Sequence, residues 1–146
     1  MNILDFLQIH NEKKQELEVF EVLDSDDRIT NETVAFVEYD VKCKLPKNYI
    51  DFCIALGGGY FGFTIIHSMD KKSQWYIGEV LHKFSYYLPN GYLPFSDDQV
   101  GGFYCFKIVN NVATDSEIFY IDSSGKIDET HYKSFFEYVI DKAYSF

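Results

Sequence analysis

A segment bracketed by a proline and three glycines is the feature of this sequence that most constrains its fold. Pro46 stands at its start, and Gly57, Gly58 and Gly59 follow its end. Proline suits the first helical turn because its missing N–H would have no partner there, and glycine readily takes the positive φ that ends many helices. Four apolar residues between them recur at i, i+3, i+4 and i+7 and form one face: Tyr49, Phe52, Cys53 and Leu56. We therefore predict a short helix that packs on the rest of the protein.

Capping residues and apolar periodicity predict four further helices. Each begins just after a side chain that can accept a hydrogen bond from the free N–H groups of the first turn. The capping positions are Asn2, Thr30 or Asn31, Ser73, and Ser134, which is followed by Glu137 in the pattern of a capping box. The last of these helices carries the clearest apolar stripe: Phe136, Val139, Ile140 and Ala143.

Runs of aromatic and β-branched residues predict the strands. Residues 16–23 alternate apolar residues with glutamates, which predicts a first strand. Further strands are predicted over residues 61–67, 92–95, 102–109 and 117–122, with turns between them. Helices followed by a meander of short strands are typical of an α+β fold. We expect a single domain over residues 1–146, with a mostly antiparallel central sheet, helices packed against it, N-terminal helices and a C-terminal capping helix.

The chain is strongly acidic, with 23 Asp and Glu against 13 Lys and Arg and a formal net charge of −10. Such a field repels nucleic acid and anionic membranes and speeds encounter with a basic partner. We therefore expect no nucleic acid and no membrane among the partners; a solvated acidic surface without a partner is the alternative. No apolar run approaches the ~20 residues of a membrane span. The N-terminus lacks the features of a secretory signal, so we expect a cytoplasmic protein.

No template for catalysis or for a cofactor occurs in the sequence. Residues 57–62 match G-x-G-x-x-G, but a helix precedes them and a strand follows, the reverse of a dinucleotide site. The four histidines are dispersed, and the three cysteines form no C-x-x-C pair. We expect no catalytic residue, no cofactor, no metal and no enzyme activity, and we expect the cysteines to be packed, reduced thiols. An enzyme whose Asp, His and Tyr side chains converge only in the fold is the alternative.

Two acidic loops and one aromatic pair are the candidate partner-binding residues. Exposed carboxylates attract a basic partner, and aromatic side chains dominate binding hot spots. The alternative is that these residues stabilise the fold. Asp side chains often accept hydrogen bonds from their own backbone in turns, and aromatic rings usually pack in the core. Tyr76 and Tyr86 lie outside the apolar stripe of their helix and offer further aromatic surface. The candidates are Asp24, Asp26, Asp27, Tyr60, Phe61, Asp97 and Asp98.

Several motifs follow one another in a definite order along the chain. Glu38 precedes the Leu45-Pro46 pair, and Tyr49 and Phe52 stand in the helix before the glycines. Three later motifs are Leu93-Pro94-Phe95-Ser96-Asp97-Asp98, Gly101-Gly102-Phe103-Tyr104-Cys105-Phe106, and Lys133-Ser134-Phe135-Phe136-Glu137-Tyr138-Val139. The ordered set resembles the Smi/Knr-type domain of the SUKH superfamily from Thr30 to Ala143. Residues 1–29 depart from it most.

This resemblance carries expectations about function. Bacterial SUKH domains commonly resemble immunity proteins, which act in the cytosol and block a polymorphic toxin domain, in many cases a nuclease. It implies that the chain is a non-catalytic immunity protein whose partner is a cognate, basic toxin domain. An acidic inhibitor suits that role, since a nuclease presents a basic cleft to phosphates. A regulatory scaffold module that binds other intracellular proteins is the alternative.

Overall fold

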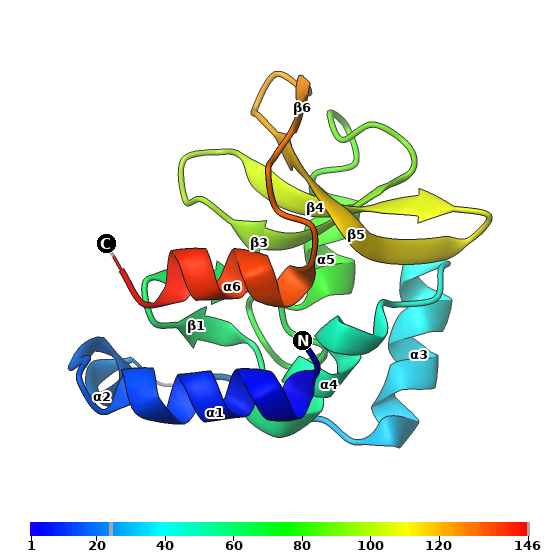
Figure 1. Cartoon of the computed structure of the whole chain (residues 1–146). Coiled ribbons are helices and arrows are strands. Elements are labelled where there is room, and N and C mark those ends of the chain that lie inside the picture. The colour runs from blue at the N-terminus through cyan, green and yellow to red at the C-terminus, as the bar shows by residue number, and fades with distance from the viewer. Residues whose placement is uncertain (24, 146) are drawn as a thin grey trace.

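Helices lie on both faces of one antiparallel sheet (Figure 1). The computed structural model describes residues 1–23 and 25–145. Within them the strand order is β1-β2-β3-β4-β5-β6, so each strand pairs with its neighbours in sequence. The α+β prediction with an antiparallel sheet is confirmed. The strands are β1 (Gly59–Phe61), β2 (Thr64–Ile66), β3 (Tyr92–Asp97), β4 (Phe103–Val109), β5 (Val112–Ile121) and β6 (Ile127–Glu129).

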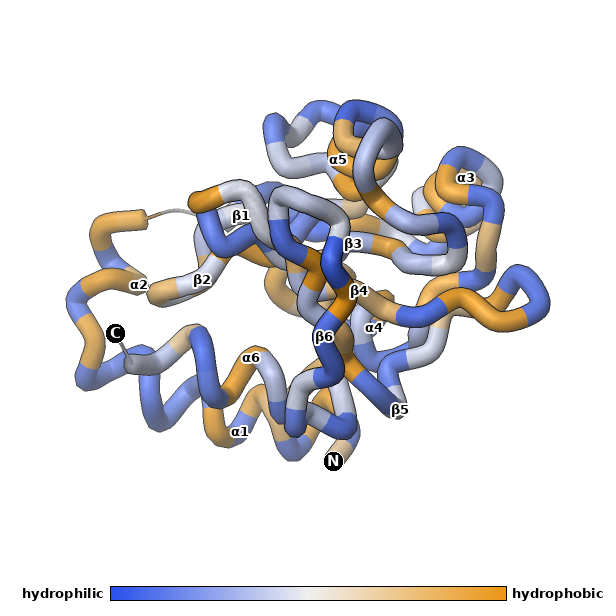
Figure 2. Tube along the Cα trace, turned by 90° about the horizontal axis from the view of Figure 1, so that it is seen from above, coloured by the Kyte–Doolittle hydropathy of each residue, from blue (hydrophilic) through white to orange (hydrophobic). Residues whose placement is uncertain are grey.

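The helices divide between the two sides of the sheet. They are α1 (Ile3–Lys14), α2 (Val19–Val22), α3 (Asn31–Val41), α4 (Lys47–Leu56), α5 (Ile77–Lys83) and α6 (Phe135–Ala143). Figure 2 shows α5 and α3 beyond one side of the sheet and α6 and α1 beyond the other. Helix α4 packs against both α1 and α6. This arrangement leaves α5 as the helix that covers the end of β3.

Helix α4 forms as its bracketing residues predict. It follows Pro46 and ends at Gly57, whose φ is +75°. Tyr49, Phe52 and Cys53 are buried, and the Tyr49 hydroxyl donates to the backbone oxygen of His67 at 2.6 Å. The helix is therefore tied to the segment that leaves β2.

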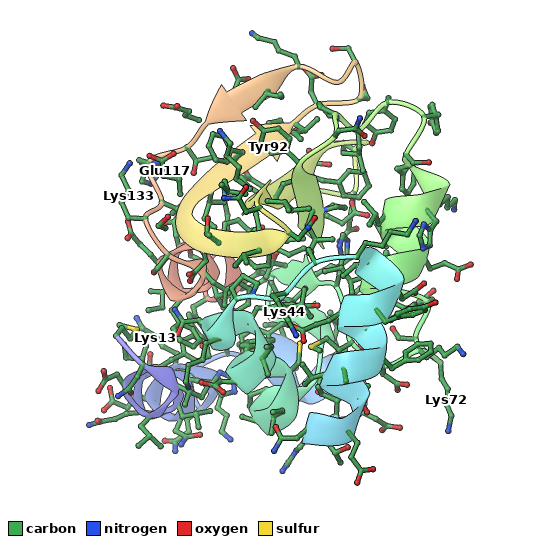
Figure 3. All side chains as sticks on the ribbon, turned by 90° about the vertical axis from the view of Figure 1, so that its right-hand side faces the viewer. Lys13, Lys44, Lys72, Tyr92, Glu117 and Lys133 are labelled. Carbon is green, nitrogen blue, oxygen red and sulfur yellow. The ribbon has the colours of Figure 1, made fainter. Side chains whose placement is uncertain are left out.

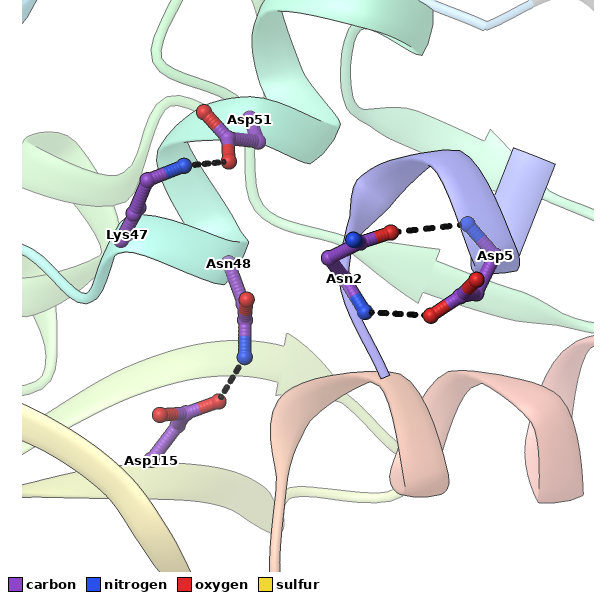
Figure 4. A network of polar contacts seen from close by, with 6 residues as sticks. All are labelled: Asn2, Asp5, Lys47, Asn48, Asp51 and Asp115. Atoms are coloured by element: carbon purple, nitrogen blue, oxygen red, sulfur yellow. Dashed lines mark hydrogen bonds and ion pairs between the residues drawn. The ribbon is translucent and has the colours of Figure 1, made fainter.

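Helices α1 and α6 have the predicted caps. The Asn2 side-chain oxygen accepts from the N–H of Asp5 at 2.9 Å, and the Asp5 carboxylate accepts from the N–H of Asn2 (Figure 4). At α6, the Ser134 hydroxyl oxygen accepts from the N–H of Glu137 at 3.1 Å. The Glu137 carboxylate accepts from the N–H of Lys133 instead of Ser134, so only one half of the capping box is made.

The strand predicted over residues 16–23 is wrong, because this segment contains the short helix α2. The N–H of Val22 donates to the oxygen of Glu18 at 3.2 Å, which closes a helical turn. The Phe20 ring packs 5.2 Å from the His10 ring and 5.3 Å from that of Phe61. In the described part of the chain, the outer edge of β1 pairs with Ser25 alone, and no strand of the sheet includes residues 16–23.

Three further boundaries differ from the sequence predictions. The single strand over 61–67 is a hairpin, since Gly62 turns the chain between β1 and β2 at a φ of +57°. Ser73 does not cap α5, which begins at Ile77. Strand β5 starts earlier than predicted because Asn110 and Asn111 both take positive φ in a tight hairpin turn. Strand β6 was not predicted.

Two buried clusters stabilise the sheet, one on each face. The larger lies on the side of α4 and α6, where the Phe95 and Phe106 rings stack with centroids 4.2 Å apart. The smaller lies under α5 and includes Phe103 and Cys105. All three cysteines are buried free thiols, as predicted. No helix in the described part of the chain is long and apolar enough to span a membrane.

Candidate partner-binding surface

The first acidic loop is docked onto the glycine-rich turn. The Asp26 carboxylate accepts from the Ser73 hydroxyl at 2.5 Å, and its backbone N–H donates to the oxygen of Gly58 at 2.7 Å. Asp27 is exposed beside it. Asp24, the remaining candidate of this loop, lies outside the described residues. The loop is thus held in one place while it still presents carboxylate to solvent.

The glycines after α4 make room for this loop. A Cβ at Gly57 would lie 2.1 Å from the backbone oxygen of Asp26, and one at Gly59 would lie 2.7 Å from its carboxylate. Both glycines also have positive φ, which disfavours any other residue. The run therefore receives an acidic loop, which accounts for its composition without a nucleotide.

The aromatic pair Tyr60 and Phe61 is divided between surface and core. Phe61 is 3% exposed and packs against Phe52 with ring centroids 4.9 Å apart, so its ring offers no surface to a partner. Side chains alternate along a strand, and Tyr60 points the other way. Its half-buried ring meets Trp75 edge-on at 5.9 Å.

Asp97 and Asp98 occupy the second acidic loop in different ways. One Asp98 oxygen accepts from the N–H groups of Val100 at 2.8 Å and Gly102 at 2.9 Å, and the other accepts from the Tyr120 hydroxyl. Asp98 is therefore committed to the turn. Asp97 accepts from the N–H of Gln99 through Oδ1 alone. Burial raises the pKa of Asp97, and the neighbouring charge of Asp98 raises it further.

A cleft of about 540 Å³ lies between α5 and the loop before it, with Asp97 in its lining. Trp75 stands in the wall of this cleft and also contacts Tyr60. Ser73 joins the cleft to Asp26, because its hydroxyl donates to Asp26 and accepts from the N–H of Trp75 at 2.8 Å. The complete lining is Ser73, Gln74, Trp75, Glu79, Val80, Lys83, Phe84 and Asp97.

The structure thus brings three sequence candidates around one loop. Asp26 reaches the loop through Ser73, Tyr60 through Trp75, and Asp97 across the cleft. We call this region the Trp75 surface and define it as Asp26, Tyr60, Ser73, Trp75, Glu79 and Asp97. Sequence reasoning did not single out Glu79; it expected the Trp75 ring to be in the core or half-buried, and the ring is half-buried. The available signal was an aromatic residue two positions before a helix that carries charges of both signs.

The further tyrosines expected at the surface behave differently. Tyr86 is 81% exposed, as its position outside the apolar stripe predicts. The same prediction is wrong for Tyr76, which is 4% exposed and donates from its hydroxyl to Asp40 at 2.7 Å. That hydrogen bond lowers the pKa of Asp40. Tyr76 therefore holds α5 against α3 and is not free to meet a partner.

A larger hollow of about 660 Å³ lies between the end of α3 and the β4–β5 hairpin. Tyr39, Lys42 and Lys44 line it, together with the asparagine turn. Its lysines make it less suited to a basic partner than the Trp75 cleft. Away from this hollow, Lys13, Lys72 and Lys133 lie well apart from one another in Figure 3.

The titratable groups in the interior are held neutral. Burial lowers the pKa of His10 and of His67 to about 4. Burial raises the pKa of Cys43 to about 11 and that of Cys53 to about 12, which disfavours the nucleophilic thiolate. Among residues 1–23 and 25–145, no three His, Cys, Asp or Glu side chains are placed to hold a metal ion.

Comparison with known proteins identifies the family. The family SUKH_6, described as "SMI1-KNR4 cell-wall", matches residues 31–139, and the chain belongs to it. The match runs from the start of α3 into α6, so it includes the cleft and leaves α1 and α2 outside. This agrees with the resemblance that begins at Thr30.

A solved structure shares the fold. It is described as "Crystal structure of protein from Pseudomonas syringae pv. tomato" and has a TM-score of 0.66 with 14% sequence identity. The alignment covers 90% of this chain and 96% of that chain. At this identity the likeness concerns the fold alone. Curated proteins provide no match.

Proposed function

We propose that this protein is a cytoplasmic immunity protein that binds and neutralises a cognate toxin domain through the Trp75 surface. Domains of its family are generally immunity-protein-like. The observation that carries the proposal is a cleft lined by Asp97, Ser73 and Trp75 in a chain of net charge −10. Asp26 and Tyr60 contact this lining through Ser73 and Trp75. Asp27 extends the acidic rim. Phe61 and Asp98, which are engaged inside the protein, are not part of it.

Neutralisation by this surface needs no chemistry. The acidic field steers a basic toxin domain toward the inhibitor, which raises the association rate. Tyr60 and Trp75 then supply aromatic contact area, and aromatic anchors of this kind carry much of the binding energy of protein interfaces. If the toxin is a nuclease, the bound inhibitor occupies the basic cleft that its nucleic acid substrate needs. Inhibition is therefore expected to be stoichiometric.

Coexpression with the toxin-like product of the adjacent gene tests the proposal. We expect the two proteins to copurify in equal amounts and the immunity protein to restore growth of cells that make the toxin. A double charge reversal, Asp26→Lys with Asp97→Lys, is expected to abolish protection, whereas Asp128→Lys on β6 leaves it intact. Copurification without any protection would favour the scaffold alternative and reject the proposal.

A further inference from the structure

The lining of the Trp75 cleft combines two aromatic rings and one aliphatic side chain with polar and charged groups. Trp75 and Phe84 line it from opposite ends of the segment that contains α5, and Val80 lies between them on the helix. Its volume of about 540 Å³ is in the range of roughly 300–1,000 Å³ that is typical of small-ligand pockets. The cleft can therefore enclose one long side chain of a partner.

Two carboxylates in the lining have oxygens that can accept further hydrogen bonds. No hydrogen bond from the described residues reaches Oδ2 of Asp97, whose Oδ1 accepts from Gln99. Glu79 is exposed and forms no ion pair with the described part of the chain. Burial already raises the pKa of Asp97, so a cation beside it would stabilise the ionised form. The charge of the cleft thus favours a positively charged group.

A lysine of the protein itself, Lys83, already lies over one of the aromatic rings of the cleft. The Lys83 ammonium lies 5.4 Å from the centroid of the Phe84 ring, at a distance where a cation is attracted to the ring face. Lys83 is exposed and sits at the rim. A partner's cation entering the cleft would compete with this ammonium.

We infer that the Trp75 cleft receives an arginine side chain of the partner. The guanidinium stacks on an aromatic wall and donates to Asp97 and Glu79, and Lys83 swings outward as it enters. Arginine suits the cleft better than lysine, because a planar guanidinium stacks on aromatic rings and can donate to two carboxylates at once. This inference deepens the proposed function and rests on it for the identity of the partner.

Trp75 is the only tryptophan of the chain, so its fluorescence reports directly on the cleft. The probe is N-acetyl-arginine methylamide, and its neutral isostere, N-acetyl-citrulline methylamide, is the control. At low salt we expect a saturable change in Trp75 emission with the arginine probe and none with the citrulline probe. An equal response to both, or no response to either, would overturn the inference.

Two single substitutions in the lining should change the affinity for the arginine probe in opposite directions. Asp97→Asn keeps the acceptor for Gln99 and removes the charge, and we expect about tenfold weaker binding of the arginine probe. Lys83→Gln removes the competing ammonium, and we expect binding to become about threefold tighter. Glu117→Gln changes the charge equally on exposed β5, outside the cleft, and should leave binding unchanged.

This test separates the inference from the proposed function. If the arginine probe does not bind but the toxin is neutralised, only the arginine cleft is rejected. If the probe binds as expected but cells are not protected, the cleft stands and the immunity function is rejected.

Discussion

The carboxylate of Asp98 holds a loop together, whereas one oxygen of its neighbour Asp97 accepts no hydrogen bond from the described residues. Asp98 accepts from two backbone N–H groups and from Tyr120, and Gly102 lies so close that a Cβ would be 2.1 Å from the Tyr120 hydroxyl. Asp97 accepts a single bond from Gln99. Two adjacent residues of one type therefore serve structure and surface separately.

Substitution of these two residues should separate the roles. In Asp98→Ala three donors lose their acceptor, and we expect the free energy of unfolding to fall by about 2 kcal/mol. In Asp97→Asn the acceptor for Gln99 is kept, and we expect a change below about 0.5 kcal/mol. Urea denaturation measures both. Equal losses in the two variants would contradict the assignment.

His10 gives the fold a dependence on pH. Its pKa is lowered to about 4 by burial, from 6.5 in the unfolded chain, and the same holds for His67. Between these values the unfolded chain binds more protons, so the free energy of unfolding falls as the pH falls from 6.5 toward 4.

The variant His10→Phe removes one of the two titrating groups while it keeps a ring beside Phe6 and Phe61. Between pH 4 and 6.5, we expect the free energy of unfolding of this variant to change less with pH than that of the unmodified protein. The difference in slope is up to about 1.4 kcal/mol per pH unit, the value for one proton. Urea titrations at several pH values measure the slope. An unchanged slope would show that His10 is charged in the folded protein.

At the scale of elements, Asp115 joins two helices to the sheet. From β5 its carboxylate accepts from the Asn48 side chain of α4 and from the N–H of Phe135 at the start of α6, both at 3.0 Å. Figure 4 shows the contact with Asn48. A carboxylate at the N-terminus of α6 also complements the helix dipole.

We expect Asp115→Ala to lower the free energy of unfolding by about 2 kcal/mol, because two partly buried donors lose their acceptor. Asp128→Ala on β6 is the matched control. Its exposed ion pair with Lys126 spans 3.8 Å, and we expect a change within about 0.5 kcal/mol. Thermal unfolding of both variants provides the measurement, and similar losses would argue against Asp115 as a joint.

Elements with local signals were predicted, and those that depend on distant contacts were not. Caps and apolar periods lie within the segment they define, so α1, α4 and α6 are confirmed. The segment 16–23 alternates like a strand, but it pairs with none of the described strands, and Phe20 instead packs on His10 of α1. The three residues of β6 are too few for a periodic signal.

In the candidate site too, the features with a local sequence signal were predicted and those that depend on distant contacts were not. The acidic loops were predicted from composition, which is local. The cleft was not, because it forms only where α5 packs across the end of β3. The burial of Phe61 likewise depends on Phe52 and Phe20, which come from other elements.

At the scale of the whole molecule, the proposed function relies on the net charge of −10 to steer a basic toxin domain toward the protein. Steering acts over about 10 Å at 0.1 M salt and is screened as the salt concentration rises. We expect the association rate constant with the toxin domain to fall at least about tenfold between 0.02 M and 0.5 M salt, with a smaller change in the dissociation rate. Stopped-flow mixing measures both constants. A salt-independent association rate would contradict electrostatic steering.

The decisive test of the Trp75 surface is the dissociation constant of the toxin complex, compared between two aromatic variants. Trp75→Ala removes the wall of the cleft, and Tyr86→Ala removes an 81% exposed ring outside the Trp75 surface. We expect at least about tenfold weaker binding for Trp75→Ala, provided that circular dichroism shows it folded, and unchanged binding for Tyr86→Ala. Unchanged binding in folded Trp75→Ala would contradict the assignment of the Trp75 surface as the site where the toxin binds.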